Sequence, residues 1–238
     1  MCSQFKLTAD LDSISKSLGI SLSNKIRENV SSFSQHVYPY TTSPVVISKL
    51  NEPSLELMNY SLIPNWSISR KPKWSTYNAR LDRVNGKTNK TEFIYDLPTW
   101  RDAFNSRHCL VPLSGFIESC SFGSHAGKLV EFSGVNYNLL FAAGIWDSWT
   151  DRQTGEIINS FAIITDDPIP YFMQVGHDRQ PVFLAGEDCL KWLQASLTLQ
   201  DGYIFLKNNQ QKLEYQVEII RATKTTITQS DYDLFNSL

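Results

Sequence analysis

The sequence predicts an α+β domain whose core is a mainly antiparallel, curled β-sheet or open barrel, flanked by a few helices. Short runs rich in β-branched and aromatic residues recur along the chain, with few helical segments between them. Strands and helices therefore do not alternate as they do in βαβ units, which argues against a parallel sheet. With 238 residues, 42% of them hydrophobic, the chain is long enough to bury one large core, and we expect a single domain over 1–238.

The predicted elements follow from composition and spacing. A first helix is expected over 11–33, capped by Asp10 and with Gly19 as the point at which it can break. Two short helices are expected at 98–107 and 186–195, and 151–156 is expected to be a turn that joins two strands. The expected strands are 44–50, 55–63, 109–119, 128–133, 139–149, 158–165, 181–184 and 215–220.

Cysteine spacing and hydropathy exclude several classes of protein. The four cysteines are irregularly spaced without a CxxC pair, which indicates neither a disulfide framework nor a zinc site. No metal or other cofactor is expected. The chain begins without an apolar signal core, and no run approaches the roughly 18 apolar residues of a membrane span. We therefore expect a cytoplasmic protein that does not contact a membrane.

Charge is concentrated in one segment, 70–90. It holds seven Lys/Arg residues against one acid, Asp82, an excess of +6 that leaves −8 for the remainder of a chain whose net charge is −2. The cations are Arg70, Lys71, Lys73, Arg80, Arg83, Lys87 and Lys90. Trp66, Trp74 and Tyr77 flank or interleave them, so the segment combines groups that contact phosphates with groups that stack on bases. A solvated basic loop with buried aromatic residues is the alternative interpretation.

Cys2 lies directly behind the initiator Met1. Removal of Met1 would leave Cys2 with a free α-amine and a thiol on neighbouring carbons, and both groups are partly nucleophilic at neutral pH. This pair suits reaction with an aldehyde. The alternative is an N-terminal cysteine of no chemical consequence.

Three further stretches place polar groups at the ends of apolar runs. Glu118 lies in an apolar strand, where a carboxylate is costly unless it has a partner, although the solvent face of an edge strand would also accept it. His177 lies in a loop and is either a proton shuttle or polar surface. Asn78 and Arg80 alternate, so in an extended segment they project to one side, where they could hold a sugar oxygen and a phosphate or close a turn.

An ordered set of motifs carries a family resemblance. The motifs are "MCSQF", "SLIPNW", "NAR", "RHCLVPLSGFIE", "FAAGIWD", "SFAIIT" and "GHDRQPV". Together they resemble the SRAP family, in order and with sensible spacing, from Met1 to about Leu193. The remaining segment, 194–238, shows only a vague resemblance and supplies no assignment.

The resemblance implies recognition of abasic sites in single-stranded DNA and a covalent DNA–protein crosslink through Cys2. The amine of Cys2 would form a Schiff base with the ring-opened sugar, and its thiol would then close a thiazolidine ring. Asn78 would orient the amine or the sugar, Glu118 would assist ring opening and proton transfer, and His177 would be the second acid/base group. Such a protein would count as an enzyme of lyase or peptidase-like class that protects the lesion during a DNA damage response.

The resemblance also implies a set of DNA-binding side chains. Arginines would bind the phosphates that flank the lesion, and tryptophans would stack on a neighbouring base or wedge against a duplex end. The expected DNA-binding residues are Arg80, Arg179, Trp66, Trp74, Lys73 and Arg83. The expected partner is a single DNA strand with an abasic site, bound by a monomer.

The sequence departs from the family pattern at several positions. Ser3 and Gln4 follow Cys2 where the family has glycine and arginine, which removes a charged contact beside the nucleophile. The usual Tyr-Asn segment with a nearby proline is replaced by 38–44, and Ser119 replaces the tryptophan that normally follows Glu118.

Two other functions remain open. One is a non-covalent module for single-stranded DNA, in which Cys2 is incidental. The other is a thiol autopeptidase in which Cys2, His177 and Glu118 are nucleophile, base and orienter. Only Met1 precedes Cys2, so an ordinary aminopeptidase suffices for its removal and the second idea has little motive.

Overall fold

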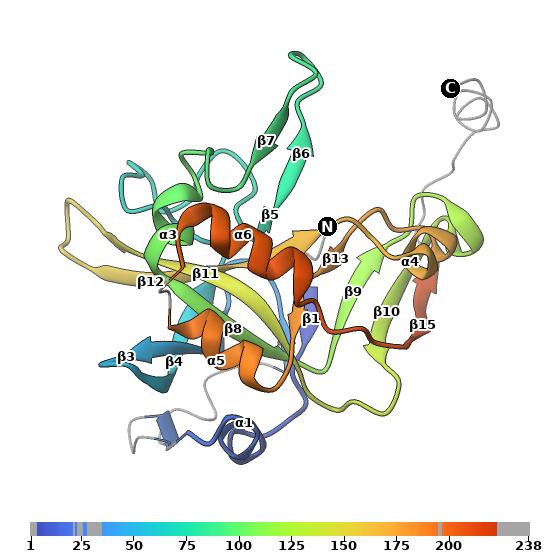
Figure 1. Cartoon of the computed structure of the whole chain (residues 1–238), viewed down its shortest axis with the longest axis horizontal. Coiled ribbons are helices and arrows are strands. Elements are labelled where there is room, and N and C mark those ends of the chain that lie inside the picture. The colour runs from blue at the N-terminus through green and yellow to red at the C-terminus, as the bar shows by residue number, and fades with distance from the viewer. Residues whose placement is uncertain (1–3, 21, 23–25, 28–34, 195–196, 223–238) are drawn as a thin grey trace.

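The computed structural model describes residues 4–20, 22, 26–27, 35–194 and 197–222. Strands dominate it, and its helices are short (Figure 1). The predicted α+β class with a mainly antiparallel, curled sheet is confirmed.

Five strands form the core as a closed ring. Their order is β12–β4–β3–β8–β11, and β11 pairs with β12 to close the ring. The β12–β4 contact is parallel and the other four are antiparallel. These strands are β3 (Thr42–Lys49), β4 (Glu52–Tyr60), β8 (His108–Leu113), β11 (Leu140–Thr150) and β12 (Ile157–Asp166).

A second sheet has the order β15–β10–β9–β1–β2. Its strands are β1 (Gln4–Lys6), β2 (His36–Val37), β9 (Gly115–Ser119), β10 (Lys128–Gly134) and β15 (Tyr215–Ala222). All the pairs are antiparallel, and β9 lies inside the sheet between β10 and β1. Neighbouring strands therefore cover both hydrogen-bonding edges of β9, so Glu118 does not lie on an edge strand.

Short strands extend β12 and β11 at the periphery of the barrel. β5 (Asn78–Arg80) runs parallel to β12, and β13 (Gln180–Pro181) is antiparallel to it. β14 (Phe183–Leu184) pairs with β11. β6 (Asp82–Val84) and β7 (Thr91–Phe93) form a separate hairpin that projects from the body of the protein (Figure 1).

Three of the sequence-based boundaries are corrected. The helix expected over 11–33 is α1 (Leu11–Leu18), because Gly19 adopts a left-handed conformation (φ 65°) and its N–H donates to the carbonyl of Ser15. Most of 20–33 lies outside the described residues. The single run at 109–119 is two strands, β8 and β9, which belong to different sheets, and the run at 181–184 is divided between β13 and β14.

The helices α3 (Arg101–Ser106) and α5 (Glu187–Leu193) lie where helices were expected, whereas α4 (Pro170–Val175) and α6 (Leu199–Asn208) were not expected. Alternation along the barrel strands divides the core in two. Val46, Leu110 and Ala143 pack in the cluster that contains residues of α1, α3, α5 and α6. Their neighbours, such as Val45 and Val111, pack in the cluster that contains β1, β9, β10 and α4.

Trp192 on α5 joins the helices to the barrel. It is fully buried, its ring lies 3.6 Å from that of His108 with an interplanar angle of 3°, and its Nε1 donates to the carbonyls of Cys109 and Gly144. The residue therefore contributes both packing and hydrogen bonds to carbonyls at the barrel strands β8 and β11.

Trp192→Ala is expected to lower the free energy of unfolding by about 3–5 kcal/mol, because it leaves a large cavity and removes the buried indole hydrogen bonds to the carbonyls of Cys109 and Gly144. Urea denaturation followed by circular dichroism measures the change. Ile68→Ala, at a position that is 91% exposed, is the control and should change it by less than about 0.5 kcal/mol. An equal effect of the two substitutions would contradict this account of the core.

Candidate functional site

Two segments that are distant in sequence bring Glu118 and His177 together. Glu118 lies near the end of β9, and His177 follows Gly176, the residue that ends α4. Gly176 has φ 124°, and a Cβ atom there would lie 1.8 Å from the carbonyl oxygen of Phe122. The chain after β9 can therefore approach α4 this closely only because residue 176 is glycine, and Ser121 donates its N–H to the Gly176 carbonyl at this contact.

The two side chains form a buried acid/base pair. Nε2 of His177 lies 3.2 Å from Oε2 of Glu118, and the side chains are only 6% and 3% exposed. The interpretation of Glu118 as a residue on the solvent face of an edge strand is thereby wrong, because β9 is an interior strand and the carboxylate is buried. His177 is also buried, so its interpretation as polar surface is wrong.

The hydrogen-bond partner of the other ring nitrogen fixes the tautomer of His177. Nδ1 lies 2.8 Å from the carbonyl oxygen of Arg179, which can only accept, so Nδ1 carries a hydrogen and donates it. Nε2 then faces Glu118. If Nε2 and the carboxylate were both without a proton, Nε2 and Oε2 would be two acceptors in contact and would repel each other. The contact is favourable when one proton lies between imidazole and carboxylate, which makes the pair suited to taking up and releasing a proton.

Asn78 presents a buried amide in a nearby part of the barrel periphery. It begins β5, where it is in register with Ile163 of β12. The residue is 9% exposed, and neither Oδ1 nor Nδ2 has a hydrogen-bond partner among the residues that the structure describes. A buried amide without partners costs about 1–3 kcal/mol. Such a group is suited to a ligand that supplies both a donor and an acceptor.

A pocket of about 470 Å³ opens beside Asn78. Ten residues line it, three of them arginines and none of them acidic. They are Trp74, Ser75, Asn78, Arg80, Arg83, Leu97, Pro98, Thr99, Trp100 and Arg179. A concave surface with three guanidinium groups and a buried amide is suited to an anionic ligand that also carries sugar-like polar groups.

The arginines of this pocket are held by carboxylates at their outer ends. Nη2 of Arg80 lies 2.6 Å from Oδ1 of Asp167, and Nη2 of Arg83 lies 2.9 Å from Glu92. The Nε atoms of Arg80 and Arg179 are buried without a hydrogen-bond partner among the described residues. Arg80 is therefore positioned by Asp167 and still retains donor capacity for a ligand.

The expected tryptophans form a partly exposed pair. The rings of Trp66 and Trp74 are stacked with centroids 6.1 Å apart, and the residues are 42% and 46% exposed. Nε1 of Trp66 donates to the carbonyl of Pro98, which fixes the pair against a residue of the pocket wall. Trp74 lines the pocket, whereas Trp66 reaches it only through this stacking, and the exposed Lys73 is not among the lining residues.

The structure thus brings most of the expected residues into one neighbourhood. Asn78, Arg80, Arg83, Arg179 and Trp74 line one pocket. Glu118 and His177 form a direct pair, which is joined to the pocket through the Arg179 carbonyl. Cys2 lies outside the described residues.

The sequence reasoning missed Thr165. This residue ends the apolar run 158–165, lies in register with Arg80 and is fully buried. Its Oγ1 has no hydrogen-bond partner within the described part of the chain. A hydroxyl at the end of an otherwise apolar strand is the signal that could have indicated it.

The described cysteines are unsuited to nucleophilic chemistry. Cys109, Cys120 and Cys189 are buried and form no disulfide. Burial raises the pKa of Cys120 to about 11, with a further contribution from Glu118, and that of Cys189 to about 12, and it raises the pKa of Cys109 well above its ordinary value. All three are therefore protonated thiols at neutral pH and are shielded from reagents.

We expect no more than one thiol of the native protein to react with N-ethylmaleimide at pH 7.5 within minutes, and four after denaturation, because the three described cysteines are buried. Intact-mass spectrometry counts the added groups, and peptide mapping assigns the first one. Rapid labelling of Cys120 in the folded protein would contradict the buried environment described for it.

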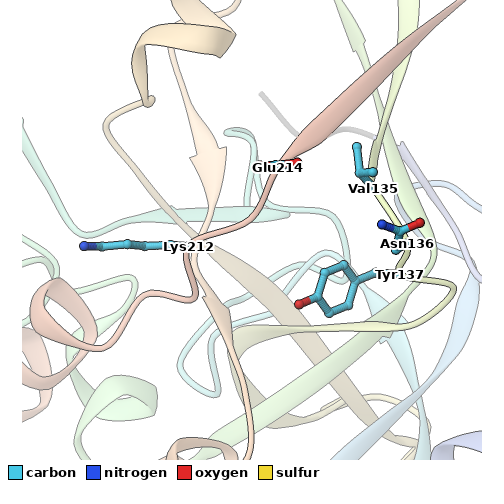
Figure 2. Close-up of a pocket in the computed structure, with 5 residues that line it drawn as sticks. All are labelled: Val135, Asn136, Tyr137, Lys212 and Glu214. Carbon is cyan, nitrogen blue, oxygen red and sulfur yellow. The ribbon is translucent and has the colours of Figure 1, made fainter.

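A second hollow of about 470 Å³ lies where the chain leaves β10 and enters β15, lined by Val135, Asn136, Tyr137, Lys212 and Glu214. Figure 2 shows Lys212 extending away from Tyr137. None of the expected site residues lines it. In the described part of the chain, no three histidine, cysteine or carboxylate side chains are grouped so that they could hold a metal ion, and no helix is long and apolar enough to cross a membrane.

Comparison with known proteins identifies the family of this chain. The family model described as SOS response associated peptidase (SRAP) matches residues 1–223. The chain belongs to the SRAP family. The SRAP match continues past Leu193, where the motif resemblance ends, and includes α6 and all of β15.

Two SRAP-like relatives carry names that describe DNA lesions. The abasic site processing protein YoaM of Bacillus subtilis is 27% identical over 202 residues, which cover 84% of this chain and 82% of YoaM. The abasic site processing protein HMCES of Pongo abelii is 27% identical over 196 residues, which cover 65% of this chain and 51% of HMCES. The chain thus spans about half the length of HMCES.

Solved structures share the SRAP fold seen here. A crystal structure of a protein from Bacteroides thetaiotaomicron superimposes with a TM-score of 0.73 at 23% identity, covering 92% of both chains. One from Bordetella bronchiseptica gives a TM-score of 0.69 at 19% identity, covering 92% of this chain and all of that one. At these identities the likeness concerns the fold.

Proposed function

We propose that this protein recognises abasic sites in single-stranded DNA and binds them covalently through Cys2 after removal of Met1. The observation that carries the proposal is the buried His177–Glu118 pair, with its Nδ1 hydrogen bond, beside a pocket lined by arginines and a buried amide. The names of YoaM and HMCES support abasic-site processing as the general activity.

The reaction combines an aldehyde with two nucleophiles on adjacent carbons. The α-amine of Cys2 adds to C1′ of the ring-opened sugar, and loss of the carbonyl oxygen as water gives a Schiff base. The thiol then adds across the C=N bond: its sulfur bonds to the same carbon and its proton goes to the nitrogen, which closes a thiazolidine. One water is lost overall. Because amine and thiol belong to one residue, the second step is intramolecular and has a high effective molarity.

The pair is suited to the proton transfers of this sequence. Ring opening needs a proton on the departing ring oxygen, and loss of water needs a proton on the hydroxyl of the first adduct. Cys2 precedes Gln4 by two residues, so the covalent chain allows at most about 7 Å between their Cα atoms. Gln4 pairs with Ile117, the neighbour of Glu118, so the covalent chain limits how far Cys2 can be from the carboxylate.

The pocket supports recognition of the sugar–phosphate chain. Asn78 supplies a buried donor and acceptor for a sugar oxygen or the Cys2 amine, and Arg80 and Arg179 supply charge for the flanking phosphates. The stacked Trp66–Trp74 pair is exposed enough to receive an adjacent base. Lys73 and Arg83 add charge around the same opening.

Intact-mass spectrometry before and after incubation with a single strand that carries one abasic site tests the proposal. We expect a starting mass without methionine, followed by a species equal to protein plus strand minus one water that maps to Cys2. An intact strand of the same sequence is the control. Equal binding of both strands without any adduct would refute the crosslinking reaction and favour a non-covalent module for single-stranded DNA.

A further inference from the structure

The β6–β7 hairpin stands apart from the two main sheets and has a firmly held base. Leu81 donates its N–H to Thr165 of the barrel, and Ile94 donates to Leu81. Asp82 accepts from Tyr203 at 2.6 Å and pairs with Lys207 at 2.9 Å, both on α6. The hairpin is therefore fixed to the barrel and to α6, and it projects from the body at a set position (Figure 1).

The far end of this hairpin is closed and well ordered by its own hydrogen bonds. Asn85 donates its N–H to Lys90, Asn89 donates to Asn85, and the Asn85 side chain accepts from the N–H of Lys87 and donates to Glu92. These bonds define a specific turn of 85–90, so the lysines it carries are displayed on a formed structure.

The charges of the turn are uncompensated. Lys87 and Lys90 are exposed, and neither has an ion-pair partner among the described residues. Glu92 is the one acidic residue of β7, and it is already held by Arg83 and Asn85. The turn 85–90 therefore presents two free ammonium groups and no free carboxylate.

The cations are continuous with those of the pocket. Arg80 and Arg83 line the pocket, and Arg83 also belongs to β6, which leads directly to the turn. At about 3.3 Å per residue, Lys87 in the turn lies no more than about 13 Å from Arg83 along the chain. Like charges spaced along one projecting element favour a polyanion that continues out of the pocket.

We propose that the turn of the β6–β7 hairpin, through Lys87 and Lys90, binds the backbone phosphates of the DNA strand on one side of the lesion. This inference rests on the proposed function and extends its site beyond the pocket. The turn carries no aromatic residue, so these contacts are independent of base sequence. An acidic protein partner is the competing occupant.

The test uses the full chain with Lys87→Ala/Lys90→Ala and strands that contain tetrahydrofuran, an abasic analogue that cannot form a Schiff base. Fluorescence anisotropy gives Kd between 50 and 300 mM NaCl. Removal of two phosphate contacts should reduce the slope of log K against log salt by about 1.4, because each contact on a single strand contributes about 0.7. Lys16→Ala/Lys191→Ala, on α1 and α5, is the matched control and should leave the slope unchanged.

Strand length provides a second readout. Extending the strand on one side of the lesion should strengthen binding by the parent protein and not by the hairpin variant, whereas extension on the other side should affect both equally. An unchanged slope together with unchanged length dependence overturns the inference and leaves an acidic protein as the occupant to consider.

The outcome is separable from that of the proposed function. A short strand with a true abasic site, which does not reach the turn, should be crosslinked equally by the parent and the hairpin variant. If it is, and the hairpin variant shows no binding defect, only the hairpin inference fails. If the parent forms no adduct while the slope still changes, the hairpin binds DNA and the crosslinking proposal fails.

Discussion

Cys2→Ala is expected to form no stable adduct with an abasic strand, although its affinity for the strand should remain within about threefold of the parent. The variant keeps a free α-amine after removal of Met1, so it can still form a Schiff base, but it lacks the sulfur that closes the ring. Sodium borohydride should therefore trap a covalent species in the variant. Without reductant, denaturing electrophoresis should show none.

Cys120→Ala is the matched control for this substitution. Cys120 is 3% exposed and lies two residues after Glu118, and its raised pKa keeps it protonated. The control should crosslink at the parent rate. An undiminished adduct in Cys2→Ala without reductant would show that another nucleophile reacts and would refute the assigned mechanism.

Glu118→Gln is expected to slow crosslink formation at saturating DNA by about 10²–10⁴-fold, the range ascribed to general acid/base catalysis. The amide of glutamine can donate to Nε2 of a neutral His177, so the contact is retained while the transferable proton is lost. Single-turnover kinetics on gels measure the rate. The affinity for the tetrahydrofuran strand should change less than about twofold, because Glu118 does not line the binding pocket.

His177→Gln should give a similar loss, and the double variant should be no slower than the slower single variant, since the two groups act as one pair. Glu56→Gln and His125→Gln, at residues on β4 and after β9, are the matched controls. A small loss for both site variants, or losses that multiply in the double variant, would contradict a shared proton.

Much of the fold is predictable from the sequence because the barrel strands are long and locally consistent. Runs such as 139–149 and 158–165 carry enough β-branched and aromatic residues to indicate strands without any partner. The division of 109–119 into β8 and β9 could not be predicted in this way. It occurs at Ser114, whose N–H donates to the carbonyl of Lys6 and whose Oγ accepts from the N–H of Thr8. This break depends on β1, more than 100 residues earlier, and composition does not reveal it.

The site residues were indicated by type, but their environment depends on tertiary pairing. Alternation alone leaves Glu118 free to face solvent, and its burial is visible only in the tertiary structure, where His177 lies against its carboxylate. The three-residue β5 has no local signature, since it is defined by pairing with β12. Asn78 is therefore recognisable from the sequence as a candidate. That its amide and the hydroxyl of Thr165 are buried without hydrogen-bond partners among the described residues becomes visible only once β5 is paired with β12.

Arg179 serves two neighbouring features with different parts of one residue. Its guanidinium lines the anion pocket, and its carbonyl oxygen holds Nδ1 of His177. A phosphate that draws Arg179 toward itself therefore also acts on the peptide unit that orients the imidazole. Arg179→Ala leaves this carbonyl in place and removes the guanidinium group, so it would uncouple phosphate binding in the pocket from the alignment of the imidazole.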